Sequence, residues 1–171
     1  MRFTTFLLAL TTLVVAAQAS QIQTSSIHVE KIDEDIVPSD MRNLRAARQQ
    51  TRRLRNRLRQ LVNQARRSRG LKNLIGSRDI NVKAQKWAKY MARTGDFRHG
   101  TLTDGVTSTW RRLGENIAYN YSIEGGHNSL MNSPGHRANI LSPHYNTIGI
   151  GVVQRADGRI YICQVFMQKV F

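Results

Sequence analysis

The spacing of apolar residues is typical of helices in the first half of the chain and of strands at its end. Leu44, Ala47, Thr51, Leu54, Leu58, Leu61 and Ala65 recur at alternating intervals of three and four residues. One face of an α-helix repeats in this way, so the pattern predicts a long helix that stops near Gly70. A second set of residues (Ala84, Trp87, Ala88 and Met91) predicts another helix from Ile80 to Arg93.

Two apolar runs near the end of the chain, residues 148–153 and 160–166, have the composition of β-strands. Asp157-Gly158 lies between them and is typical of a hairpin turn. Residues 94–112 contain three glycines and are expected to be rich in loops. Helices followed by a strand pair, with further short elements between, indicate the α+β class.

The N-terminus has the pattern of a cleavable secretory signal in residues 1–19. Arg2 precedes a short apolar run, and Ala17-Gln18-Ala19 provides the small residues that signal peptidase recognises. The run is shorter than the ~20 residues that span a bilayer. Residues 20–40 follow as an acidic leader without periodicity, which we expect to be flexible. We therefore expect a secreted, extracellular protein.

Positive charge is concentrated in one part of the chain. The net charge is +15, and residues 41–78 contain thirteen Lys and Arg but no acidic residue. Arginines from Arg42 to Arg59 form a stripe along the first predicted helix. Residues 41–67 could bind an anionic membrane surface or polyanion, pair with another helix, or present a solvated face. Arg52-Arg53 is also a candidate processing site, and no motif for nucleic-acid recognition is present.

The chain contains a single cysteine, Cys163, so no disulfide can form within it. Cys163 lies in the alternating run 160–166 and is predicted to be a small buried thiol.

Three short motifs follow one another in the second half of the chain: FRHG at 97–100, GENIA at 114–118 and NSPGHRANIL at 132–141. Asn63-x-x-Arg66 and Gly70-Leu71 precede them, and IGIGV at 148–152 follows. Together they resemble the CAP superfamily of cysteine-rich secretory, antigen-five and group-one pathogenesis-related proteins, in its cysteine-poor, bacterial-type form. The resemblance implies an α-β-α sandwich with a small antiparallel sheet between helices. It predicts a CAP (SCP-like) domain at 58–171 after a basic helical extension at 41–57.

The resemblance also implies a cleft in which His99, Glu115 and His136 converge. Ser133 stands where many relatives have a second glutamate, which weakens any mechanism that needs paired carboxylates. Two imidazoles and a carboxylate are zinc-ligand types, but they would equally form a hydrogen-bonded network that orders the loops. The sequence separation of His99 and His136 does not by itself bring them together. The resemblance favours a weakly held divalent cation such as zinc over a dedicated cofactor.

The other candidate residues have less specific patterns. Ser133 precedes Pro134 and is expected to cap a short helix rather than act as a nucleophile. His127 and His144 are predicted to face solvent. Asn120-Tyr121-Ser122 is a glycosylation sequon, meaningful in a eukaryotic host.

From the resemblance we expect a non-catalytic module that binds lipid- or sterol-type ligands or extracellular partners. Two alternatives remain open. One is a metal-dependent peptidase or esterase that uses the same cleft. The other is an interaction protein that assembles through its basic helix.

Overall fold

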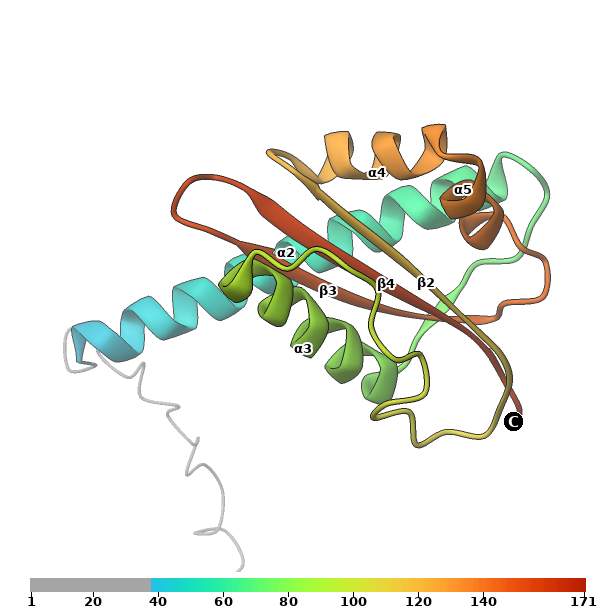
Figure 1. Ribbon diagram of the computed structural model, residues 1–171, viewed down its shortest axis with the longest axis horizontal. Helices are drawn as coiled ribbons and strands as arrows, with labels where there is room; N and C mark the ends of the chain where they lie inside the picture. The colour runs from blue at the N-terminus through green and yellow to red at the C-terminus, as the bar shows by residue number, and fades with distance from the viewer. Residues whose placement is uncertain (1–37) are drawn as a thin grey trace, which may run out of the picture. The chain divides into compact units, whose positions relative to one another are not determined.

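The computed structural model of this chain describes residues 38–171, so the expected signal sequence (1–19) and most of the acidic leader (20–40) lie outside the described residues. The elements follow in the order α2 (Ser39–Arg67), β1 (Ile75–Gly76), α3 (Arg78–Thr94), β2 (Trp110–Asn120), α4 (Ile123–Asn132), α5 (Pro134–Ile140), β3 (Thr147–Gln154) and β4 (Ile160–Lys169) (Figure 1). No helix among these residues is long and apolar enough to cross a membrane.

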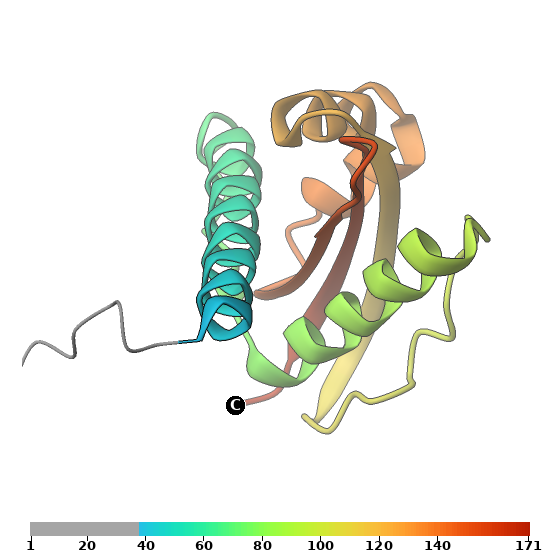
Figure 2. The same cartoon turned by 90° about the vertical axis from the view of Figure 1, so that its left-hand side faces the viewer.

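The sheet has the strand order β1-β3-β4-β2. Strand β1 is parallel to β3, whereas the β3–β4 and β2–β4 pairs are antiparallel. Helix α3 covers one face of this sheet, and α2, α4 and α5 cover the other (Figure 2). The chain therefore has the predicted α-β-α sandwich, with one short parallel pair added at an edge.

Alternation along β4 divides the interior into two cores. Ile162 and Phe166 face α2, α4 and α5, whereas Cys163 and Val165 face α3. The thiol of Cys163 is fully buried, as predicted, and burial raises its pKa well above the ordinary value.

Helix α3 lies directly on the backbone of β3, because Gly149 and Gly151 have no side chain to hold it away. A Cβ atom on Gly149 would lie 2.7 Å from Asn81 N, and one on Gly151 would lie 2.6 Å from Gln85 N, with the preceding carbonyl groups closer still. The two glycines of the IGIGV motif thus set the distance between helix and sheet.

The predicted length of helix α2 is confirmed, but only part of its predicted apolar face is buried. It ends at Arg67, and Gly70 follows with a φ of 70°. Residues 41–50 are exposed throughout, and Leu44 of the predicted apolar face is 51% exposed. The buried residues are Leu58, Val62 and Arg66, at intervals of four. The predicted division at residue 58 falls inside this continuous helix and stays a prediction.

Strand β2, which lies between the predicted helices and the predicted strand pair, differs most from the expected secondary structure. Residues 110–112 were expected in a loop, but strand β2 begins at Trp110. It continues to Asn120, and its register with β4 is irregular between Trp110 and Arg112. The predicted strands and their hairpin are confirmed as β3 and β4, with Gly158 at a φ of 81° in the turn.

Candidate functional site

Strand β2 forms an edge of the sheet and carries two buried polar residues, Glu115 and Asn116. Because neighbouring residues of a strand point to opposite faces, the two side chains hold different parts of the chain. Glu115 Oε1 accepts from Gly100 N (3.0 Å) and lies 2.9 Å from His99 Nδ1, and Glu115 Oε2 accepts from Cys163 Sγ (3.6 Å). Asn116 Nδ2 donates to the backbone carbonyl of His136 (3.0 Å). The GENIA motif therefore ties the other two motifs to one strand.

The FRHG segment is held in place residue by residue. Phe97 packs edge-on against Tyr119 at 5.0 Å between ring centroids. The Arg98 guanidinium lies over the Trp87 ring, and the Trp87 indole donates to Arg98 O at 2.9 Å. A Cβ atom on Gly100 would lie 2.9 Å from the Trp87 ring, so only glycine fits there without a shift. His99 is thereby presented on a fixed loop.

Helix α5 brings His136 to the same edge from the other face of the sheet. Asn139, one turn further on, donates to Asn116 Oδ1 (2.9 Å) and to Glu115 O (3.3 Å). The imidazole centroids of His99 and His136 are 6.4 Å apart. Burial lowers the pKa of His136, and the neighbouring His99 lowers it further.

The three predicted cleft residues therefore lie together, and their chemistry can be compared with a metal site. The Glu115 side chain is only 2% exposed, and its oxygens already accept hydrogen bonds from the fold. Within residues 38–171, no group of three His, Cys, Asp or Glu side chains is placed to hold a metal ion. This geometry fits a hydrogen-bonded network better than a three-ligand zinc site, so no chemical step is derived through a metal.

The remaining candidates have mixed outcomes. Ser133 occupies the N-cap position of α5, but its side chain makes no capping hydrogen bond. His144 is exposed, as predicted. Asn120 is the last residue of β2, and its side-chain oxygen accepts from Tyr121 N at 2.8 Å. Glycosylation of Asn120 stays a prediction.

The prediction that His127 faces solvent is wrong. His127 is 6% exposed, because it lies one turn from each of the buried residues Ile123 and Leu130 on α4. Its Nδ1 atom is buried without a hydrogen-bond partner among the described residues. Burial lowers the pKa of His127 below its ordinary value of 6.5.

His127 should make the protein less stable in mild acid. The folded state holds this imidazole neutral, so below pH 6.5 the unfolded chain binds more protons and the free energy of unfolding falls. Urea unfolding at pH 7, 6 and 5 should show this loss, and His127→Gln should reduce it. His144→Gln removes an exposed imidazole and should keep the wild-type slope. An unchanged slope in His127→Gln would rule out this role for His127.

Several residues that build the site were not singled out from the sequence. Asn116 and Asn139 lie inside two of the motifs, and Trp87 was assigned only to a helix face. Gln164 on β4 accepts from Asn116 Nδ2 at 3.2 Å. Polar residues inside otherwise apolar segments were the available signal, since a buried amide requires a partner.

Comparison with known proteins identifies the family of this chain. A family model described as CAP, the cysteine-rich secretory protein family, matches residues 59–166. The uncharacterized protein YkwD of Bacillus subtilis is 32% identical over 104 residues, which cover 56% of this chain and 40% of that protein.

Solved structures show the same fold. An extracellular SCP-domain protein from Bacillus anthracis aligns with a TM-score of 0.64 at 22% identity, over 78% of this chain and 44% of that one. A cysteine-rich secretory protein from Staphylococcus aureus aligns with a TM-score of 0.59 at 28% identity, over 70% and 40%. An outer surface protein from Borrelia burgdorferi gives 0.62 at 16% identity, over 70% and 96%. The chain thus spans less than half of the two longer structures and of YkwD.

Proposed function

Because the chain belongs to the CAP family of cysteine-rich secretory proteins, we propose that it is a secreted binding module whose ligand contacts the cleft of His99 and His136. Its similarity to proteins described as extracellular or outer-surface supports secretion. The sequence pattern of residues 1–19 supports it independently.

The hydrogen bonding of Glu115 is the observation that carries a binding role. A general base needs a carboxylate that is free to reach a substrate proton. Glu115 is instead buried and accepts from Gly100 N and Cys163 Sγ while it lies against His99 Nδ1. This arrangement supports a carboxylate that orders the cleft, leaving the histidine rings to contact the ligand.

The FRHG segment and strand β2, which carry His99 and Glu115, also present an apolar rim. Phe97 is 41% exposed and Tyr119 is 51% exposed, and the two rings are in contact. Exposed aromatic faces on the segments that carry His99 and Glu115 suit a ligand with an apolar body and a polar end. This favours the lipid- or sterol-type ligand that the family resemblance implies. A divalent cation held weakly by the imidazoles belongs to the same proposal.

Titration of the purified protein with a fluorescent sterol and a fluorescent fatty acid tests this function. The double variant Phe97→Ser/Tyr119→Ser should weaken binding at least tenfold because it removes the apolar rim. Met41→Ser/Leu44→Ser changes two exposed apolar residues of α2 and serves as the matched control. Equal affinity of both double variants, or no binding of either ligand, would contradict the proposal.

The hydrolase alternative predicts a different result in the same preparation. Peptide and ester substrates would be cleaved when zinc is added, and His136→Ala would abolish cleavage while the protein stays folded. That outcome would replace the binding role by a catalytic one.

A further inference from the structure

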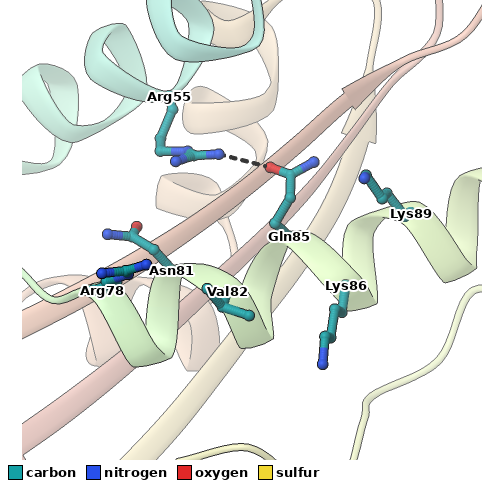
Figure 3. Close-up of a pocket in the computed structure, with 7 residues that line it drawn as sticks. All are labelled: Arg55, Arg78, Asn81, Val82, Gln85, Lys86 and Lys89. Carbon is teal, nitrogen blue, oxygen red and sulfur yellow. Dashed lines mark hydrogen bonds between the residues drawn. The ribbon is translucent and has the colours of Figure 1, made fainter. Parts of the chain in front are cut away.

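A concave surface lies at the edge of the sheet opposite strand β2, where α2 and α3 flank strand β3 (Figure 3). Strand β1 pairs only with Thr147 and Ile148, so within residues 38–171 no strand pairs with the rest of β3 on this side. A groove of about 550 Å³ runs here between the two helices. It is separate from the cleft of His99 and His136, and it is of the size of small-ligand pockets.

Two amide side chains of α3 form the wall of this groove by binding the free edge of β3. Asn81 Oδ1 accepts from Ile150 N at 2.9 Å. The Gln85 amide bonds both backbone groups of Val152, accepting from its N–H at 3.1 Å and donating to its carbonyl at 2.9 Å. The strand edge is thereby satisfied, which protects it from pairing with another chain. The groove is consequently fixed in shape.

Arg55 reaches into the groove from α2. Its Nη2 donates to Gln85 Oε1 at 3.0 Å, which crosses the space between the helices (Figure 3). Its Nε is buried and has no partner among the described residues. Burial lowers the pKa of Arg55, and the like charge of Arg59 lowers it further. An anion in the groove would offset the repulsion between Arg55 and Arg59.

Further cations line the groove without acidic partners. Arg78, Lys86 and Lys89 are exposed on α3, and their side chains form no ion pair or hydrogen bond with a residue in 38–171. No carboxylate is among the described lining residues. Arg59 adds a charge near the Arg78 end of the groove. A Cβ atom on Gly76, two residues before Arg78, would lie 2.7 Å from Arg59 Nη1. Lys89 points toward the α2 side of α3, whereas Lys86 points away from it (Figure 3).

We propose that this groove binds a linear sulfated polysaccharide. Arg78 and Lys89 are eleven residues apart on one helix, which separates their attachment points by about 16 Å. A single phosphate or sulfate group cannot contact both, whereas a chain with repeated charges can. Sulfate oxygens accept the charge-assisted hydrogen bonds that Arg and Lys donate.

The shape and composition of the groove distinguish this ligand from other polyanions. A bilayer surface is flat on this scale and would not reach the half-buried Arg55 between two helices. Single-stranded nucleic acids are held mainly by stacking on aromatic side chains. The described lining consists of Arg, Lys, Asn, Gln and Val, with no aromatic ring. A sulfated polysaccharide is narrow enough to reach Arg55 between the helices, and it needs no aromatic ring in the lining.

Calorimetric titration of the purified protein with a heparin-derived octasaccharide at 150 mM NaCl tests the proposal. Arg78→Gln/Lys89→Gln should weaken binding at least tenfold. Arg93→Gln/Arg111→Gln removes the same charge from exposed positions outside the groove and should change affinity less than threefold. Circular dichroism on heating should show that both double variants stay folded, since all four side chains are exposed.

Equal losses in the two double variants would overturn the proposal, because binding would then follow net charge alone. Absence of octasaccharide binding would overturn it as well. So would stronger binding of a single-stranded oligonucleotide of equal charge, or of vesicles rich in anionic phospholipid. None of these outcomes affects the cleft proposal, since the two surfaces lie at opposite edges of the sheet.

Discussion

Replacement of Gly151 by alanine should lower the free energy of unfolding by about 3 kcal/mol. The added methyl group would lie 2.6 Å from Gln85 N and closer to the carbonyl group of Ala84. These are backbone atoms of α3, so no side chain can turn aside to make room. The helix would have to move away from β3 and would open a gap around Ile80, Ala84 and Ala88, which are fully buried.

Guanidinium unfolding followed by circular dichroism measures this loss. Gly135→Ala is the matched control, because a Cβ atom there has no atom within 4 Å and the residue lies within helix α5. Alanine in a helix is favoured over glycine by about 0.5–1 kcal/mol, so this variant should be as stable as wild type or slightly more stable. A Gly151→Ala protein within 0.5 kcal/mol of wild type would disprove the close packing of α3 on β3.

The parts of the fold that could be predicted from the sequence are those with strict periodicity. The apolar spacing around Ala84 and Met91 predicted a helix at 80–93, and α3 spans Arg78–Thr94. The strands at 148–153 and 160–166 were recognised because their apolar runs end at a turn signal. In both cases a regular face packs on the core, so local pattern and tertiary contact agree.

Strand β2 could not be recognised by the same means. Its buried stretch includes Glu115 and Asn116, whose polarity is compensated by partners on the FRHG loop and α5. A pattern of apolar residues cannot reveal such burial, because the partners lie far away in the sequence. The first third of α2 shows the converse, since Leu44 continues the apolar stripe but is 51% exposed.

The meeting of His99, Glu115 and His136 was predicted from the family resemblance rather than from their spacing. His99 lies on a loop after α3, and His136 lies on α5 on the other side of β2. The structure brings them to 6.4 Å between ring centroids because the GENIA strand binds both segments. The groove at β3 had no motif at all. It is formed by two helices that flank one strand edge. The only signal in the sequence was the excess of positive charge in residues 41–78, which indicates an anionic partner but not where it binds.

Replacement of Arg66 by methionine should destabilise the fold by about 3–5 kcal/mol. Arg66 is 1% exposed, and its guanidinium donates to four backbone carbonyls: Lys72 O (2.9 Å), Ile140 O and Ser142 O (2.8 Å each) and Tyr145 O (3.4 Å). Methionine fills part of the volume but leaves these acceptors unpaired. Ile140 is the last residue of α5, where the helix dipole favours a cation.

The neighbouring arginine offers the matched control for this prediction. Arg67 is exposed, and its side chain bonds only Asn73 Oδ1 (3.2 Å) within residues 38–171, so Arg67→Met should change stability by less than about 0.5 kcal/mol. Arg66→Lys keeps the charge but loses the planar fork of donors, so its stability should fall between wild type and Arg66→Met. Urea unfolding of the three variants separates these cases. Equal losses at positions 66 and 67 would contradict the prediction, because Arg66 bonds the end of α5 and the loop before β3 whereas Arg67 bonds neither among the described residues.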